Sequence, residues 1–417
     1  MAELVTLFSA DCTPYMDWQS LGAVFSHRKA GIPGSITRLL ACDDSLYRHA
    51  SVVPTFVHQN YALLHPEDPY VPYNKPGSLV SWLQAEPDFQ GTLLMGDADM
   101  IFLSAEDIVA TASRVKAGHA ISATYGYLKG VDEPDIVHRF LPDLPSGVVV
   151  PKCGGWTMLT AADARCVAPR WLNLTEQVRT APDGELYWNR MGDAYVTPER
   201  PRPWIAEMYG FVFALADCGI AVTQDGLHGR PLMLYPNYET SKPPAILHYG
   251  LRMGYGGWSF DKHEHHVDQL TCPPTLFEIP PPPTNLTERL IWKVIDTLNE
   301  ALLDYGDRAC SLPECATWAA NGECARNSAF MQRACAPACM PPSSVAYPPP
   351  PTPPVPLVIL PRSVPRKMVL QVLVENTPRT NVQLRALFVF WFCFLSCLAC
   401  RASVRKRKER RRDGKSQ

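Results

Sequence analysis

Hydrophobic and polar positions alternate with two different spacings along the first 275 residues. Short apolar runs predict strands over residues 4–8, 36–42, 92–95 and 120–125. Apolar residues at helical spacing predict helices over residues 17–30, 78–85 and 105–117, with Gly or Pro close to several of their ends. Strands that alternate with helices and short polar turns favour an α/β layered fold.

The pattern changes after residue 280 and divides the rest of the chain into short segments. We assign residues 1–280 to the main domain, which four consecutive prolines close. A linker and a helix follow over residues 281–308, with helical spacing from 286 to 305. A cysteine-rich module then covers residues 309–340. The proline-rich segment 341–366 should form an extended spacer.

The last apolar stretch indicates a membrane anchor. ALFVFWFCFLSCLAC, from Ala386 to Cys400, carries no charge. We predict a transmembrane helix over residues 385–404, in which Arg401 reaches the interface; a buried core helix is the alternative. The basic tail over residues 405–417 would stay on the cytosolic side, so that the main domain faces the lumen of the endoplasmic reticulum or Golgi.

The start of the chain conflicts with this topology. The first strand begins almost at Met1, without the charged and apolar regions of a secretory signal. Without a signal the protein would be tail-anchored, and its cysteine-rich module would lie in a reducing compartment. We therefore expect that the natural N-terminus is longer than the one given.

Composition supports the secretory pathway and excludes one class of partner. The 39 basic and 41 acidic side chains nearly balance, so no overall field favours nucleic acid. Five of the 14 cysteines fall between Cys310 and Cys339, and such a dense cluster needs disulfides, which persist in oxidising compartments. Asn173 and Asn285 begin N-glycosylation acceptor triplets.

The strongest candidate for chemistry is Asp97-Ala98-Asp99, which directly follows an apolar strand. Hard divalent cations bind carboxylate oxygens together with substrate phosphates. Open α/β sheets also bind ligands at the carboxyl ends of their strands. The pair therefore predicts a metal site for a phosphate-bearing substrate, while a solvated turn is the commoner origin of this pattern.

Other polar residues could complete such a site. His248 follows an apolar run and could supply a neutral imidazole ligand, although a hydrogen-bonded core histidine fits the fragment as well. Glu207 lies among aromatic residues and could bind hydroxyl groups or act in catalysis; an exposed residue on a core helix is the alternative. We assign donor binding to Lys75 and Asn74, which precede a predicted helix; a solvated loop is the alternative. We assign it also to the glycine pair Gly154 and Gly155, which permits close approach of a ligand to the backbone; a plain turn is the alternative.

A cluster of histidines, His263 to His266, invites a zinc interpretation. Its spacing differs from the i, i+4 pair of a helical zinc site. A polar surface segment near the acceptor is therefore the better interpretation, and a zinc hydrolase remains a rival hypothesis.

Five stretches of the chain together resemble a known family. They are SADCTPYMDWQSLGAVFSHRKAGIPGSITRLLACDD, YVPYNKPGSLVSWL, MGDADMIF, WIAEMYGFVFA and ILHYGLRMGYGGWSFDKHEHH, in order over roughly residues 4–280. They closely resemble the peptidyl serine α-galactosyltransferase family of plants and green algae, which is related to the hydroxyproline O-arabinosyltransferases.

That resemblance implies a fold, a substrate class and a set of roles. It implies a GT-A type glycosyltransferase with a Rossmann-like nucleotide-sugar domain, a UDP-sugar donor and Mn²⁺ or Mg²⁺. Galactose would pass from UDP-galactose to serine of hydroxyproline-rich, extensin-like proteins with retained configuration. Asp97 and Asp99 would hold the metal and diphosphate, with His248 as third ligand; we add Glu207 as a catalytic candidate that orients the acceptor.

A second resemblance covers the cysteine-rich module. CSLPECATWAANGECARNSAFMQRACAPAC is similar to ShK-type modules, which have six cysteines where this copy has five. The resemblance implies the disulfides Cys315–Cys335 and Cys324–Cys339, which leaves Cys310 without its usual partner. The module would be a small binding unit or a structural spacer.

Two further rival functions remain besides the zinc hydrolase. A hydroxyproline O-arabinosyltransferase would share the fold and use a different donor. The side chains of the donor pocket would determine which of the two sugars is bound. A non-catalytic binding protein for proline-rich glycoproteins is the second rival, and the intact Asp97-Ala98-Asp99 argues against it.

Overall fold

The fold is described from a computed structural model, in which residues 3–44, 47, 49–181, 190–193, 195–196, 202–225, 231–271, 274–309 and 315–327 are described. All of these residues fall within one compact unit, Met1–Thr352. The predicted spacer 341–366, membrane span 385–404 and basic tail 405–417 lie outside the described residues. Within the described ranges, no helix is both long and apolar enough for a membrane crossing.

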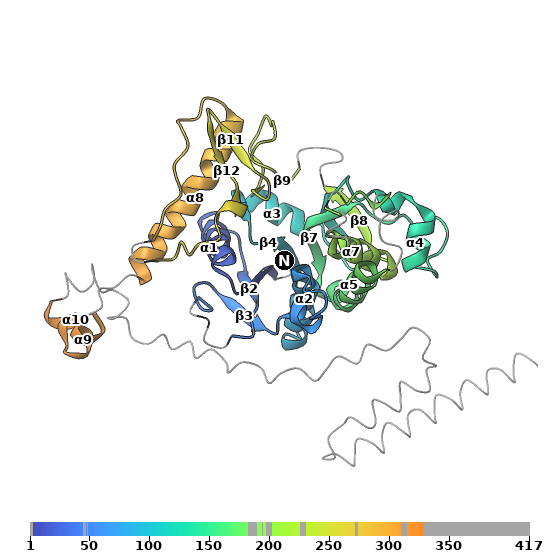
Figure 1. Ribbon diagram of the computed structural model, residues 1–417, viewed down its shortest axis with the longest axis horizontal. Helices are drawn as coiled ribbons and strands as arrows, with labels where there is room; N and C mark the ends of the chain where they lie inside the picture. Colours follow the sequence, from blue (N-terminus) through green and yellow to red (C-terminus); the bar gives the residue numbers. More distant parts are fainter. Residues whose placement is uncertain are drawn as a thin grey trace, which may run out of the picture. The chain divides into compact units, whose positions relative to one another are not determined.

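A mixed seven-stranded sheet forms the centre of the fold, in the order β3-β2-β1-β4-β7-β6-β8 (Figure 1). The strands are β1 (Leu4–Asp11), β2 (Ser35–Ala41), β3 (Thr55–His58), β4 (Thr92–Asp97), β6 (His119–Thr124), β7 (Cys153–Thr160) and β8 (Ala221–Asp225). The strands β3, β2, β1 and β4, which come first in this order, are parallel to one another. β7 runs antiparallel to both β4 and β6, whereas β6 and β8 are parallel. The carboxyl ends of β1, β2 and β4 therefore meet at one edge, where ligands bind in open α/β sheets.

Two pairs of helices pack beside this sheet. Helices α5 (Ala161–Thr180) and α7 (Ala206–Asp217), both green in Figure 1, lie against each other, and α2 (Asn74–Ala85) contacts α5. Helix α8 (Leu286–Ala309) runs along α1 (Pro14–Lys29). The two helices approach closely at Gly22, because a side chain there would come within 2.5 Å of Leu298.

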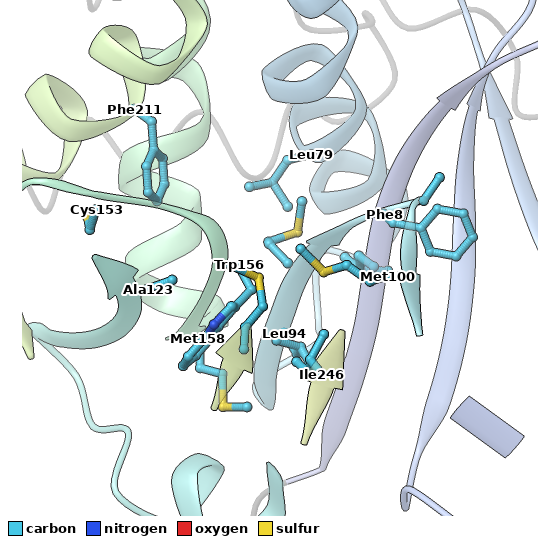
Figure 2. Close-up of a cluster of buried hydrophobic side chains, with 14 of the residues drawn as sticks. Phe8, Leu79, Leu94, Met100, Ala123, Cys153, Trp156, Met158, Phe211 and Ile246 are labelled. Atoms are coloured by element: carbon cyan, nitrogen blue, oxygen red, sulfur yellow. The ribbon is translucent and has the colours of Figure 1, made fainter. Parts of the chain in front are cut away.

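The hydrophobic core explains why these elements form. Trp18 of α1 and Trp156 of β7 are among its largest fully buried side chains. Figure 2 shows part of this core, with Leu79 of α2 and Phe211 of α7 labelled together with residues of the strands. Arg38 is also fully buried, and its Nη1 donates to Asp17 Oδ1 at 2.9 Å, so its charge is paired.

Small strands complete the fold beyond the main sheet. β5 (Met100–Phe102), β9 (Met233–Leu234) and β10 (Ile246–His248) form a three-stranded sheet in the order β5-β10-β9. β11 (Met253–Tyr255) and β12 (Trp258–Phe260) form a hairpin. Its turn residues Gly256 and Gly257 have φ angles of 58° and 85°, which two-residue hairpin turns require and which glycine adopts without strain. The remaining named helices include α3 (Ala105–Ala112), α4 (Pro134–Phe140), α9 (Cys315–Ala320) and α10 (Glu323–Arg326).

The predicted strands and helices are confirmed, with shifts at their ends. Helix α2 begins at Asn74, four residues earlier than predicted, because Pro76 lies in its first turn, where proline is tolerated. Helix α3 ends at Ala112, five residues earlier than predicted. The predicted α/β architecture is confirmed by the alternating order of the main elements.

Two disulfides tie neighbouring elements together. Cys12 and Cys42 join the ends of β1 and β2, and Cys166 and Cys218 join α5 to the end of α7. Cys153 is buried and free. In the cysteine-rich module Cys324 is disulfide-bonded, while the side chains of Cys315, Cys335 and Cys339 lie outside the described part of the chain, so the predicted pairs stay predictions.

Candidate active site

Strand pairing brings Asp97, Asp99 and His248 together. Asp97 is the last residue of β4, and Asp99 stands just before β5. β10 pairs antiparallel to β5 with His248 opposite Met100, and the Tyr249 amide donates to the Asp99 carbonyl at 3.1 Å. Residues almost 150 positions apart in the sequence therefore share one site.

The three side chains form a compact group of possible metal ligands. One ligand atom from each lies within 4.8 Å of the others. His248 Nε2 is 3.1 Å from Asp99 Oδ2 and 4.0 Å from Asp97 Oδ2. Among the described residues this is the only such group of three or more His, Cys, Asp or Glu side chains.

Two lysines neutralise the carboxylates. Lys75 Nζ is 2.7 Å from Asp97 Oδ1, and Lys262 Nζ is 2.6 Å from Asp99 Oδ2. Burial by itself would raise the pKa of Asp99, but the charges of His248 and Lys262 outweigh it and hold that pKa well below the usual range. Burial would lower the pKa of Lys75, whereas Asp97 and Glu207 raise it above the usual value. Asp99 is therefore ionised at neutral pH, as a metal ligand must be.

The group fits a divalent cation in its chemistry. Two carboxylates and an imidazole suit a first-row divalent ion such as Mn²⁺, and carboxylates alone suit Mg²⁺. His248 Nδ1 is buried and has no hydrogen-bond partner within the described part of the chain. The other ring nitrogen faces both carboxylates, so the histidine is oriented toward the place that an ion would occupy.

A pocket opens beside these ligands and collects residues from several elements. Lys75 of α2, Asp97 of β4, Gly154 and Gly155 of β7 and Glu207 of α7 all line it. Five of the residues that the sequence singled out for donor binding or catalysis thus border one cavity.

Glu207 lies in the first turn of α7 and is almost fully buried. Its amide donates to the Tyr70 hydroxyl at 3.1 Å, and its carbonyl accepts from Trp171 Nε1 at 2.9 Å. Burial raises the pKa of the Glu207 carboxyl to about 7, against the opposing charge of Lys75. A carboxyl that titrates near neutral pH is suited to proton transfer or to hydroxyl binding.

The glycine pair in β7 makes room for an aromatic ring. A Cβ atom on Gly155, whose φ is 74°, would lie 2.3 Å from the Tyr125 hydroxyl, and one on Gly154 would lie 2.9 Å from Cδ2 of the same ring. The close approach that the glycines permit is therefore to Tyr125, which lines the pocket with them.

Asn74 differs from the prediction in its surroundings. It does not line the pocket. Its Oδ1 accepts from the Tyr61 amide at 2.7 Å, and its Nδ2 donates to Asp11 Oδ1 at 2.7 Å and Asn60 Oδ1 at 2.9 Å. These bonds connect α2 to the carboxyl end of β1, where burial raises the pKa of Asp11 to about 6.

The histidine cluster does not form a metal site with its own members. His265 stacks on Phe260 at 4.8 Å between ring centroids and packs edge-on to Phe277 at 5.1 Å. Tyr15 stacks on His266 at 4.8 Å. Among the described residues, no member of this cluster belongs to a group of three or more possible metal ligands.

The predicted glycosylation sites lie in different settings. Asn285 is exposed, and its Oδ1 accepts from the Glu288 amide at 2.9 Å at the start of α8. Asn173 lies within α5, and Thr175 of its triplet is buried with its hydroxyl bonded to the Trp171 carbonyl. Glycosylation at both sites stays a prediction.

Sequence reasoning missed two residues of the site. Lys262 lies directly before the histidine cluster, and no local pattern marks it as a partner of Asp99. Tyr235 stacks on His248 with 5.1 Å between ring centroids. Tyr235 comes from a loop and Lys262 from a short helical turn, and the position of each depends on distant parts of the fold.

Fold and site together define an α/β protein with a candidate divalent-cation site at the carboxyl edge of its central sheet. Residues 5–224 match the family described as "Hydroxyproline O-arabinosyltransferase family N-terminal domain". The chain belongs to this family.

Relatives with assigned names cover much of the chain. It is 34% identical over 336 residues to "Peptidyl serine alpha-galactosyltransferase" of Arabidopsis thaliana, a match that covers 74% of this chain and 39% of the relative. The protein of the same name from Chlamydomonas reinhardtii is 28% identical, covering 80% of this chain and 54% of the relative. "Hydroxyproline O-arabinosyltransferase 1" of Arabidopsis thaliana is 22% identical, covering 72% and 80%. The chain thus spans about half or less of the length of the two galactosyltransferases.

Solved structures resemble the chain at low similarity. The galactosyltransferase LgtC with donor and acceptor sugar analogues has a TM-score of 0.33 and 10% identity, covering 59% of this chain and 86% of LgtC. Mouse xyloside xylosyltransferase 1 has a TM-score of 0.33 and 11% identity, covering 59% and 96%.

Proposed function

We propose that this chain is a metal-dependent GT-A type glycosyltransferase that transfers galactose from UDP-galactose to serine in hydroxyproline-rich proteins. The observation that carries the proposal is the group Asp97, Asp99 and His248 beside a pocket lined by Lys75 and Glu207. The names of the two galactosyltransferase relatives support the choice of substrates.

Each residue of the site has a part in binding the donor. Asp97, Asp99 and His248 would hold Mn²⁺ or Mg²⁺, which when bound neutralises the charge of a nucleotide diphosphate. Lys75 and Lys262 pair with the carboxylates in the described structure. The two ammonium groups, which lie beside the ligands, would also bind the phosphate oxygens of the donor.

The transfer step needs only the sugar donor and the serine acceptor as reactants. The bond between the galactose C1 and the diphosphate oxygen breaks, and a bond forms between C1 and the serine oxygen on the same face. The serine proton passes to the diphosphate oxygen that leaves. Glu207, buried at the pocket wall, would orient the serine hydroxyl and stabilise the positive charge that develops on the sugar.

Transfer of arabinose to hydroxyproline is the second candidate. The name of the matching family and the similarity to "Hydroxyproline O-arabinosyltransferase 1" favour it. The same metal ligands and pocket would serve either donor. The donor assay below separates the two.

We further propose that the enzyme works in the lumen of the endoplasmic reticulum or Golgi, anchored by residues 385–404. Two disulfides in the main domain support an oxidising compartment. A protease-protection assay on microsomes tests this topology: the main domain should resist digestion until detergent is added. Digestion in intact microsomes would place it in the cytosol.

The test of function is a donor assay on the full 417-residue chain. UDP-galactose, UDP-arabinofuranose and UDP-glucose are each offered with and without Mn²⁺ and a Ser-(hydroxyproline)₄ peptide. We expect consumption of UDP-galactose that depends on Mn²⁺ and rises with peptide. Turnover of the arabinose donor alone would reassign the donor, and no turnover with any donor would refute a transferase.

Asp99→Ala supplies the decisive variant for this assay. Loss of a buried metal ligand should reduce turnover at least about 1000-fold, because the charge of the leaving diphosphate is then left without a cation. Asp143→Ala removes an exposed carboxylate elsewhere and should leave turnover unchanged. Thermal unfolding of both variants in the presence of Mn²⁺ distinguishes lost binding from lost folding.

A further inference from the structure

A second, open groove lies between the loop after β9, the hairpin strand β11 and the start of α8. Residues from all three elements line it, among them Asn237, Glu239, Tyr255 and Ile291. Asn285 lines it too, so a peptide can enter only when Asn285 carries no glycan. Its empty volume is about 1350 Å³. We infer that this acceptor groove holds the hydroxyproline-rich stretch of the acceptor peptide. The inference rests on the proposed function, which it deepens.

Aromatic contacts connect the groove to the metal ligands. Tyr235 stacks on His248 with 5.1 Å between ring centroids and an angle of 25° between the rings. Tyr238 follows at 5.3 Å from Tyr235. Tyr238 is 49% exposed and stands between Asn237 and Glu239, which both line the groove. A peptide whose serine lies at the catalytic pocket can therefore continue along Tyr238 into the groove.

The chain already binds one of its own prolines beside the groove. The Tyr255 hydroxyl, on a residue that lines the groove, donates to the Pro281 carbonyl at 2.5 Å. Cγ of Pro281 lies 3.7 Å from the position of a Cβ on Gly256. A hydrogen bond from an aromatic side chain to a backbone carbonyl is one of the contacts by which aromatic grooves bind polyproline II peptides, whose backbone carbonyls have no internal partners.

The polar residues of the groove favour a hydroxylated peptide over a phosphate-bearing ligand. Among the described residues that line it there is no Lys or Arg, while Glu239 and Glu288 contribute carboxylates. Such a surface repels phosphate groups. Carboxylate and amide oxygens accept hydrogen bonds from hydroxyl groups, so Glu239 and Asn237 can recognise the hydroxyls of hydroxyproline.

The experiment measures peptide binding directly, by calorimetry on the full chain with UDP and Mn²⁺ present. Tyr238→Ala should weaken binding of Ser-(hydroxyproline)₄ about tenfold, because it removes an aromatic stacking surface. Tyr238→Phe keeps the ring and should bind within about twofold of the original chain. Leu303→Ala, which changes an apolar residue of similar exposure on the distal half of α8, is the matched control and should leave binding unchanged.

A second variant tests the hydroxyl recognition independently. Glu239→Ala should abolish the preference for Ser-(hydroxyproline)₄ over Ser-(proline)₄ and leave proline binding intact. Equal peptide affinity in the original chain, Tyr238→Ala and Glu239→Ala would overturn the assignment of the groove. Because donor turnover by the original chain is measured separately, a failed transferase proposal and a misplaced groove give different results.

Discussion

The catalytic pocket and the acceptor groove are linked through His248, Tyr235 and Tyr238, yet they are built from different side chains. In the pocket the ionisable groups are largely buried: the Asp99 side chain is 5% exposed and that of Lys75 20%. Beside the groove Tyr238 is half exposed, and the described residues that line the groove are mostly polar and include no basic group.

This difference predicts how substitutions act in each region. Interactions between charges are strong in a buried site and are arranged before the substrate arrives. Contacts in an open groove compete with water, and a stacking ring contributes only about 0.5–1.5 kcal/mol. Pocket variants should therefore change the rate of transfer, whereas groove variants should change the affinity for the peptide.

After Asp99→Ala, the largest effect is expected from Glu207→Gln. Removing the charge while keeping the shape should lower kcat about 100-fold or more, in the range typical of a positioned acid or base. The KM for the peptide should change little, since the groove is untouched. Glu106→Gln, an exposed residue on α3, is the control. Full activity of Glu207→Gln would remove Glu207 from the mechanism, and a rise in KM alone would move it to acceptor binding.

The same variant gives a pH-dependent effect on stability. The pKa of Glu207 is raised from 4.5 to about 7, so protonation stabilises the fold. That contribution is complete below about pH 4.5 and is lost as the pH rises through about 7. Glu207→Gln should therefore match the original chain near pH 4.5 and exceed its stability by up to about 2 kcal/mol at pH 8. A constant difference in melting temperature across this pH range would contradict the raised pKa.

A smaller effect is expected from Lys262→Gln, which removes the ammonium group beside the buried Asp99. Without metal the variant should lose about 1–3 kcal/mol of stability, because a buried charge is no longer balanced. Added Mn²⁺ should stabilise this variant more than the original chain, since the cation replaces the missing ammonium group. Lys242→Gln, at an exposed position, is the control. If Mn²⁺ stabilised Lys262→Gln and the original chain equally, Lys262 and the ion would not compete for Asp99.

Much of the main sheet could be predicted from the sequence, because its strands are local apolar runs. The strand that ends in Asp97 is an example, since the buried residues of β4 directly precede the carboxylate. The carboxyl ends of parallel strands meet at one edge, so the position of Asp97 beside β1 follows from local pattern and general topology.

The rest of the site depends on contacts that no local pattern encodes. His248 reaches Asp99, 149 positions away in the sequence, because the three-residue strands β5 and β10 pair. Lys262 lies in a short helical turn, Lys262–Glu264, whose position is fixed by packing of neighbouring rings such as Phe260. Asn74 shows the converse, because its polar side chain serves the fold by binding Asp11 and Asn60.

The smallest effect isolates the role of a glycine in shaping the pocket. Gly155 and Gly118 share a φ of 74°, but only at Gly155 would a Cβ meet another group, the Tyr125 hydroxyl at 2.3 Å. Gly118→Ala should cost about 1 kcal/mol of unfolding free energy for the left-handed backbone alone. Gly155→Ala should cost at least about 1 kcal/mol more, because it also overpacks the pocket wall.

A double substitution decides whether Tyr125 is the cause. Tyr125→Phe removes the atom in closest contact, so Gly155→Ala should be less destabilising in that background than in the original chain, whereas Gly118→Ala should cost the same in both. Chemical denaturation of the single and double variants measures these differences. If Gly155→Ala and Gly118→Ala change the unfolding free energy by the same amount in both backgrounds, the pocket wall formed by β7 moves aside for a methyl group. The pocket would then be less rigid than the comparison with the open groove requires.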